Sequence, residues 1–207
     1  MANDQILNHS QLALNATIGI VLAGGQSSRM STDKASLKLK KQSMLDISTT
    51  CLKKAGVDEV YVSSSLHGGL RDLFPNCGPA AALVSSIKQL KLPEETAIVA
   101  LPVDMPLVSS QLIHDLLAAS LYEKRTVHYT DHSHISEYIF PCVCRVNNRL
   151  ISKLSSTIAS GGNLSMHALL EAHDALKIPL DKKFEKMMNT NINTPQQWQA
   201  FLKTHEA

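Results

Sequence analysis

Apolar runs that alternate with helix-like segments constrain the fold of this chain more than any other feature of its sequence. Residues 17–23 (TIGIVLA) and 96–104 (TAIVALPVD) are apolar almost throughout, and residues 58–64 (DEVYVSS) contain a shorter apolar run. Strands of a parallel sheet are buried on both faces, so they read as continuous apolar runs. The strand–helix–strand order therefore predicts a three-layer α/β/α fold around a mostly parallel sheet.

Helix signals fill the intervals between these strands. We expect three helices in the first part of the chain, over residues 43–56, 78–91 and 109–121. The second has Pro79 in its first turn, and the third has a serine cap at Ser109 or Ser110. The later part is predicted to hold strands over 125–130 and 136–146, and helices over 147–159, 163–175 and from about Pro195 onward.

Length and charge exclude several classes of protein. A length of 207 residues fits a leader over 1–16 and a single domain over 17–207. The 20 basic and 18 acidic residues are too balanced for a nucleic-acid binder or a membrane-surface protein. There is no signal-peptide pattern and no apolar run of about 18 residues, so we expect a cytoplasmic protein without a membrane partner. The four cysteines form no C-x-x-C pair and are expected to be reduced thiols.

Two unusual segments follow two of the predicted strands, at the sheet edge where α/β proteins bind ligands. In the first, Gly24 and Gly25 allow main-chain N–H groups to approach an anion, and Arg29 and Lys34 add positive charge. Arginine grips phosphate oxygens through two N–H groups, and lysine acts as a point charge. The segment therefore indicates a polyphosphate cradle, although a glycine turn with solvated cations would give the same pattern.

The second segment places Asp104 between two prolines at the end of a buried strand. A carboxylate in this position suits Mg²⁺, which prefers hard oxygen ligands. Aspartate is also common as a cap of a following turn, so the residues alone leave both interpretations open.

The stretch LAGGQSSRMSTDK, residues 22–34, resembles the signature L-A-G-G-x-S-x-R-M-G-x-D-K of the nucleotidyltransferases related to molybdenum cofactor guanylyltransferase. Only Ser31 departs from it, in place of a glycine. The resemblance implies a Rossmann-like nucleotidyltransferase fold with a mostly parallel, mixed central sheet. It also implies that the loop wraps the triphosphate of a nucleotide. The loop residues given this role are Leu22, Ala23, Gly24, Gly25, Arg29 and Lys34.

Further motifs extend the resemblance to most of the chain. PVDMP is similar to the family's P-C-D-M-P, which implies that Asp104 holds the catalytic Mg²⁺ and contacts the nucleotide. Asp72 matches an aspartate that precedes the family's G-P-L-A-G, here GPAAA with Gly78 and Pro79. Ser63 stands at the end of the second strand, where guanylyl members usually have a nucleotide-binding asparagine.

The acceptor side departs most from the family. NINTPQQW is similar to N-x-N-T-P-E-D-L, which implies that Asn191 and Asn193 approach the metal and the pterin substrate. An Asn-rich turn that caps the last helix is the alternative. Glu137 and Tyr138 stand where members commonly carry a His-Pro that helps to receive the pterin.

The resemblance implies an enzyme that transfers GMP from GTP to the Mo-molybdopterin cofactor, forming molybdopterin guanine dinucleotide and pyrophosphate. Arg29, Lys34 and Mg²⁺ on Asp104 would stabilise the transition-state charge. Proteins that insert or deliver the cofactor would be partners. A cytidylyltransferase, a sugar-phosphate nucleotidyltransferase and a non-catalytic nucleotide-binding protein that handles the cofactor are the alternatives. LAGG favours the guanylyl branch, whereas Ser31 motivates the non-catalytic reading.

Overall fold

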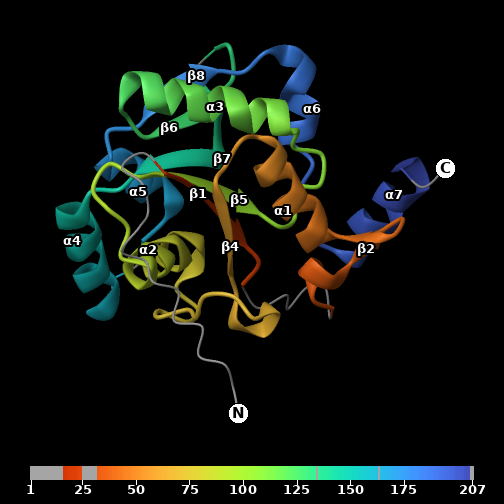
Figure 1. The fold of residues 1–207 in the computed structure, drawn as a ribbon. Helices are drawn as coiled ribbons and strands as arrows, with labels where there is room; N and C mark the ends of the chain where they lie inside the picture. Colours follow the sequence, from red (N-terminus) through yellow and green to blue (C-terminus); the bar gives the residue numbers. More distant parts are fainter. Residues whose placement is uncertain (1–15, 25–31, 134, 163, 206–207) are drawn as a thin grey trace.

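In a computed structural model, which describes residues 16–24, 32–133, 135–162 and 164–205, a six-stranded sheet forms the centre of the molecule (Figure 1). Its strand order is β4-β1-β5-β7-β6-β8. The strands are β1 Thr17–Leu22, β4 Glu59–Ser63, β5 Ala97–Pro102, β6 Val127–Thr130, β7 Glu137–Arg145 and β8 Leu176–Pro179. β1 is parallel to β4 and β5, β6 is parallel to β8, and β7 runs antiparallel to both of its neighbours. The predicted mixed, mostly parallel sheet is therefore confirmed.

Helices cover both faces of this sheet, which gives the three predicted layers (Figure 1). One layer holds α1 (Met44–Lys54) and α3 (Ser110–Glu123). The other holds α2 (Gly78–Leu90), α4 (Asn148–Ala159) and α5 (Met166–Ala172). The remaining elements are the β2–β3 hairpin (Lys38–Leu39 and Gln42–Ser43), the 3-10 turns η2 Lys34–Ser36, η3 Ser65–His67 and η4 Lys182–Phe184, and the helices α6 Glu185–Met188 and α7 Pro195–His205.

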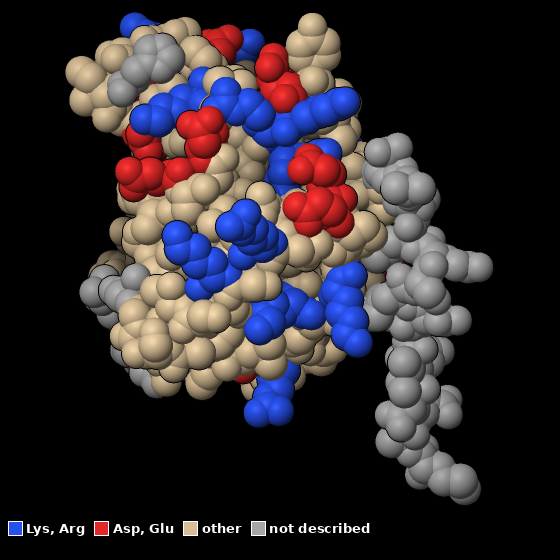
Figure 2. Space-filling view, turned by 90° about the vertical axis from the view of Figure 1, so that its left-hand side faces the viewer, with Lys and Arg blue, Asp and Glu red and all other residues tan. Residues whose placement is uncertain are grey.

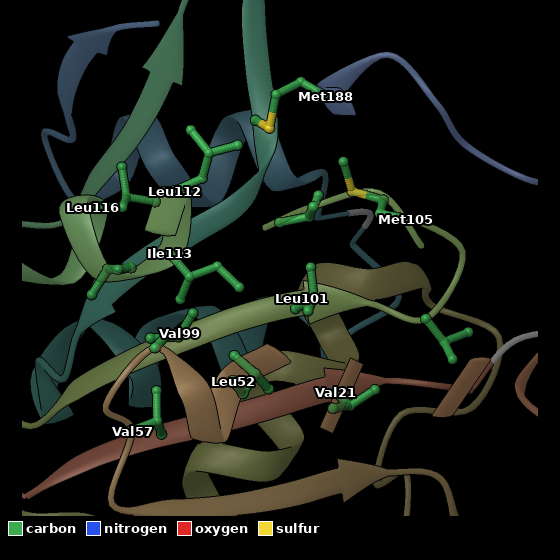
Figure 3. Packing of buried hydrophobic residues seen from close by; sticks show 14 of the residues in the cluster. Val21, Leu52, Val57, Val99, Leu101, Met105, Leu112, Ile113, Leu116 and Met188 are labelled. Atoms are coloured by element: carbon green, nitrogen blue, oxygen red, sulfur yellow. The ribbon is translucent and has the colours of Figure 1, made fainter. Parts of the chain in front are cut away.

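The apolar side chains form one cluster on each face of the sheet. Alternate residues of β1 supply both, because successive strand side chains point to opposite faces. Val21 belongs to the cluster under α1 and α3, and Ile18 and Ile20 belong to the cluster under α2, α4 and α5. Figure 3 shows the first cluster, in which Leu52 of α1 lies against the strands. Burial on both faces explains why β1 and β5 read as continuous apolar runs.

Local signals set the helix boundaries. Ser43 and Asp46 form a reciprocal capping box at the start of α1, and Gly56 follows its end with a φ of 89°. Ser109 is the cap of α3, one of the two serines predicted. α7 begins at Pro195, as predicted. Strand β8 was not predicted, because its four residues alternate between half-buried and exposed at the edge of the sheet.

Charged side chains of both signs share the surface. Figure 2, which faces the side of α4, shows Lys and Arg side chains together with groups of Asp and Glu.

Within the described residues, no helix combines the length and the apolar character needed to cross a membrane. The four cysteines are free thiols, as predicted. The predicted leader lies outside the described residues, apart from its last one.

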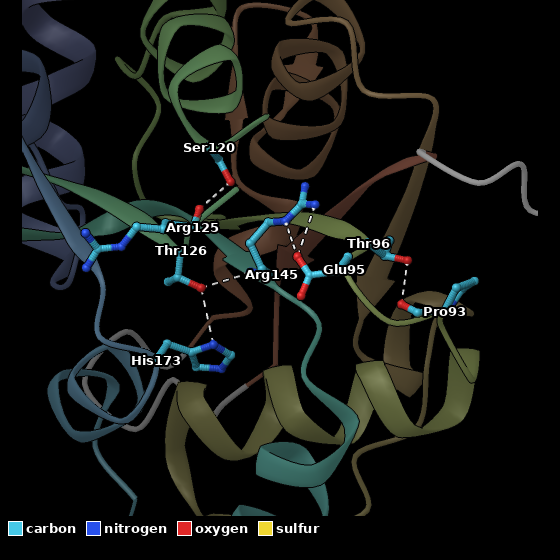
Figure 4. Close-up of polar contacts among 8 residues, drawn as sticks. All are labelled: Pro93, Glu95, Thr96, Ser120, Arg125, Thr126, Arg145 and His173. Carbon is cyan, nitrogen blue, oxygen red and sulfur yellow. Dashed lines mark hydrogen bonds and ion pairs between the residues drawn. The ribbon is translucent and has the colours of Figure 1, made fainter. Parts of the chain in front are cut away.

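A polar cluster at the amino ends of β5 and β6 ties the layers together away from the predicted ligand edge (Figure 4). Thr126 Oγ1 accepts a hydrogen bond from Arg145 N at 2.9 Å and lies 3.2 Å from His173 Nδ1. Arg145 also pairs with Glu95 at 3.4 Å. The hydrogen bonds and the ion pair of this cluster all join protein groups, and His173 Nε2 is buried without a hydrogen-bond partner. We therefore assign the cluster to stability rather than to ligand binding.

Candidate active site

The carboxyl ends of β1 and β5 lie side by side and define the candidate site. Leu22 is paired with Pro102 in the sheet, and Val103 N donates a hydrogen bond to Leu22 O at 3.1 Å. The antiparallel strand β7 begins at this same edge with Glu137. Three elements therefore border a cavity of about 550 Å³, at the edge where the sequence predicts a ligand.

A lysine, an aspartate and an asparagine from distant parts of the chain meet in this cavity. Lys34 Nζ lies 2.9 Å from Asp104 Oδ2 and donates to Asn193 Oδ1 at 2.7 Å. The side chains of Lys34 and Asp104 are about one-fifth exposed, at 19% and 21%. The ammonium group thus bridges two oxygen atoms that open onto the cavity, which is the arrangement a cation-binding centre requires.

Asp33 fixes the turn that carries Lys34. Its carboxylate caps η2 by accepting from Ala35 N at 3.2 Å, and it lies 3.1 Å from His67 Nε2. Burial acts to raise the pKa of Asp33, but hydrogen bonds from Ser36 and Ala35 and the nearby His67 lower that pKa on balance. The carboxylate therefore stays ionised and keeps the start of the lysine turn in place.

A second cavity, of about 770 Å³, adjoins the first. Its lining includes four residues that the resemblance assigns to the nucleotide: Ser63, Asp72, Gly78 and Pro79. Leu22, Ala23 and Gly24 line both cavities. A Cβ at Gly24 would meet the carbonyl oxygen of Ser63 at 3.0 Å, so a larger residue would push the loop and β4 apart by a few tenths of an ångström.

The N-terminus of α2 faces this second cavity through Gly78 and Pro79. Cys77, the cap residue, makes no side-chain hydrogen bond to the helix. The first N–H groups of α2 are therefore free of a side-chain cap, and their partial positive charge suits a phosphate or another polar nucleotide group.

The far wall of the first cavity is formed by the start of β7 and by residues near α6. Tyr138 and Phe140 line it together with Met188 and Asn191. Glu137 at its rim accepts a hydrogen bond from the Lys177 ammonium group, which is the main reason that its pKa lies below the usual value. This wall combines apolar and aromatic surface with an ionised carboxylate.

A metal ion here would be held by a few side-chain oxygen atoms together with ligands from outside the protein. Among the described residues, no group of three or more His, Cys, Asp or Glu side chains is placed to hold a metal ion. Mg²⁺, however, is commonly held by one or two protein oxygens together with water and substrate phosphates. Asp104 and Asn193 supply such oxygens around the Lys34 ammonium, so the residues present fit a magnesium ion that arrives with a nucleotide.

The structure gathers most of the residues named from sequence. Leu22, Ala23, Gly24, Lys34, Asp104, Asn191 and Asn193 line the first cavity, and Ser63, Asp72, Gly78 and Pro79 line the second. Gly25 and Arg29 lie outside the described residues. Sequence analysis missed the contact of Asp33 with His67, and it missed the hydrogen bond that Gln197 Oε1 accepts from Asn193 N. For Gln197 a signal existed, because Thr194 three residues earlier makes a T-x-x-Q capping pattern.

Comparison with known proteins gives consistent results. Residues 19–176 match the model of the MobA-like NTP transferase domain. A "Molybdenum cofactor guanylyltransferase" of Xanthomonas euvesicatoria is 32% identical over 187 residues, covering 89% of this chain and 93% of that protein. A "Probable molybdenum cofactor guanylyltransferase" of Mycobacterium avium is 29% identical and covers 85% and 90%.

Solved structures share the fold at low sequence identity. The molybdopterin-guanine dinucleotide biosynthesis protein A of Archaeoglobus fulgidus superposes with a TM-score of 0.69 at 16% identity, over 91% of this chain and 98% of that one. Rv0371c of Mycobacterium tuberculosis, in complex with manganese, superposes with a TM-score of 0.63 at 15% identity, over 92% and 100%.

Proposed function

We propose that this chain, which belongs to the MobA-like NTP transferase family, transfers GMP from GTP to the molybdopterin cofactor and releases pyrophosphate. The observation that carries the proposal is the meeting of Lys34, Asp104 and Asn193 in the first cavity, which shares Leu22, Ala23 and Gly24 with the second. A reaction between two phosphate-bearing substrates needs a binding space for each and a concentration of positive charge between them.

The donor nucleotide fits the second cavity. Its base and ribose would lie against Ser63, Asp72 and the start of α2, and its phosphates would run past Gly24 toward Lys34. Main-chain N–H groups at the glycine loop and at the helix N-terminus would hold the phosphate oxygens. Arg29, which lies outside the described residues, would add a second cationic side chain.

Asp104 and Asn193 would hold the divalent cation, which we propose to be Mg²⁺. When bound, this cation supplies charge neutralisation for the phosphates. Freed from Asp104, the Lys34 ammonium would move to the phosphate oxygens, where transition-state charge develops.

The acceptor would lie in the first cavity with its terminal phosphate toward Lys34. An oxygen of that phosphate attacks the α-phosphorus of GTP in line and forms a new P–O bond. The bond between the α-phosphorus and the oxygen that bridges to the β-phosphate breaks at the same time. Pyrophosphate leaves with the electron pair of that bond. The attacking phosphate is already ionised at neutral pH, so no side chain needs to remove a proton. The protein contributes position and charge, as in other phosphoryl transfers.

The acceptor's ring system would contact the wall that Tyr138, Phe140 and Met188 form. Aromatic and thioether side chains suit a flat heterocycle. The partners that follow are GTP, the molybdopterin cofactor and proteins that insert or deliver this cofactor in the cytoplasm.

Pyrophosphate release tests the proposal. The protein is incubated with Mg²⁺ and either GTP or CTP, with and without molybdenum cofactor. We expect release only with GTP and cofactor together, and a loss of more than about 100-fold in Asp104→Asn, which removes the charged metal ligand. Preference for CTP would contradict the guanylyl assignment, GTP binding without release would contradict the enzyme, and full activity of Asp104→Asn would contradict the metal site.

A further inference from the structure

The segment before the last helix is fastened directly to the loop that carries Asp104. Ile192 N donates a hydrogen bond to Asp104 O at 2.9 Å, and the Ile192 side chain is only 3% exposed. Trp198 and Phe201 of α7 are also buried in the cluster under α1 and α3. The C-terminal segment is thus part of the domain core at the candidate site.

Gln197 holds this segment through a capping box at the start of α7. Gln197 N donates to Thr194 Oγ1 at 3.2 Å. In return, Gln197 Oε1 accepts from Thr194 N at 3.0 Å and from Asn193 N at 2.7 Å. A capping box normally satisfies one main-chain N–H in front of the helix. Here the same amide oxygen also holds the main chain of Asn193.

Asn193 in turn restrains the ammonium group of Lys34. Its Oδ1 accepts from Lys34 Nζ at 2.7 Å, while Asp104 takes the other side of that ammonium group. Lysine has a flexible four-carbon stem, so the position of its charge depends on the partners of its end. A fixed Asn193 main chain therefore gives Lys34 a fixed partner.

We propose that Gln197 is a positioning residue, which holds Asn193 so that its side-chain oxygen restrains the Lys34 ammonium group in the nucleotide-free protein and is already in place for the cation when Lys34 moves to the phosphates. Gln197 is itself exposed and is not among the residues that line either cavity beside Lys34. Its expected effect on turnover rests on the proposed function. Its effect on the environment of Lys34 does not.

Four proteins test this role: the full-length wild type, Gln197→Ala, Gln197→Glu and the matched control Gln196→Ala. Glutamate keeps the oxygen acceptor of a capping box, whereas alanine removes it. Gln196 is the neighbouring exposed residue of the same helix and makes none of the three capping-box bonds.

The first measurement is the rate at which an amine-acetylating reagent labels Lys34, compared by peptide mass spectrometry with the exposed Lys38 of the same protein. We expect Gln197→Ala to raise the relative labelling of Lys34, and Gln197→Glu and Gln196→Ala to match the wild type. The second measurement is kcat/KM for pyrophosphate release. We expect Gln197→Ala to lower it about tenfold, because a small misplacement of a group at the reacting centre, here the Asn193 side chain, weakens catalysis strongly.

The outcomes separate the positioning role of Gln197 from the proposed function of the protein. Unchanged labelling of Lys34 in Gln197→Ala, together with a lower melting temperature, would show that Gln197 only stabilises α7 and would overturn the positioning role. Failure of Gln197→Glu to restore both readouts would overturn it as well. If the wild type releases no pyrophosphate, the proposed function is contradicted, while the labelling experiment still decides the role of Gln197.

Discussion

Lys34→Met should strengthen the binding of Mn²⁺ to the nucleotide-free protein. In the structure, the Lys34 ammonium lies 2.9 Å from Asp104 Oδ2 and 2.7 Å from Asn193 Oδ1, on the oxygens that we assign to the metal. A divalent cation that approaches these oxygens must first displace the ammonium group or be repelled by it. Methionine keeps most of the apolar stem and removes the charge.

The size of the expected gain in Mn²⁺ affinity follows from the distance between Lys34 and Asp104. Two unit charges 2.9 Å apart attract by about 6 kcal/mol at an effective dielectric constant of about 20. Hydration of the free groups offsets most of this attraction, since both side chains are partly exposed, and leaves a net value of about 1–2 kcal/mol. Removing this competition should therefore raise the Mn²⁺ affinity by roughly 5- to 30-fold.

Electron paramagnetic resonance of free Mn²⁺, titrated against protein without nucleotide, measures this affinity directly. Lys38→Met is the matched control, because Lys38 is an exposed lysine shortly after the same turn. The reasoning is refuted if Lys34→Met binds Mn²⁺ no better than the wild type, or if Lys38→Met gives the same gain. In the presence of GTP, we expect the opposite effect on nucleotide binding, because the phosphates lose a cationic partner.

Two further predictions concern stability. Burial lowers the pKa of His173 from 6.5 to about 4, so between these values the unfolded chain binds a proton that the folded chain does not. The free energy of unfolding should therefore fall on acidification, by up to about 1.4 kcal/mol per pH unit from this group. Urea titrations across pH 4 to 7 should show that the free energy of unfolding of His173→Asn depends less steeply on pH than that of the wild type. An equally steep dependence in both proteins would contradict the lowered pKa of His173. Ser43→Ala removes the capping box of α1 and should lower the free energy of unfolding by about 0.5–2 kcal/mol without changing kcat/KM. Equal free energies of unfolding for Ser43→Ala and the wild type would contradict a stabilising role of this capping box.

The main features of the fold could be predicted because their causes are local. Continuous apolar runs marked β1 and β5, and serine caps and Pro195 marked the ends of helices. β8 could not be predicted, since an edge strand of four residues carries almost no pattern of its own. The helix predicted over 163–175 proved shorter, at Met166–Ala172, because its cap is Ser165 and the chain then turns toward β8.

The candidate site could be predicted as a set of residues but not as a set of contacts. Lys34, Asp104 and Asn193 were each named from a motif. Their meeting joins positions 159 residues apart, and it depends on which strands lie side by side. The pairing of Asp33 with His67 likewise requires the loop after β4 to fold back on the lysine turn. Such contacts follow from the sheet topology, which the sequence specifies only indirectly.

The most direct test of the central claim follows the α-phosphate of the donor. The protein is incubated with Mg²⁺, molybdenum cofactor and GTP labelled at the α-phosphorus, and the products are separated and identified by mass. Label that appears in a guanine dinucleotide of molybdopterin, in equal amount to the released pyrophosphate, is the predicted result. Label that remains in GTP, or that appears as free GMP, would contradict transfer to the cofactor.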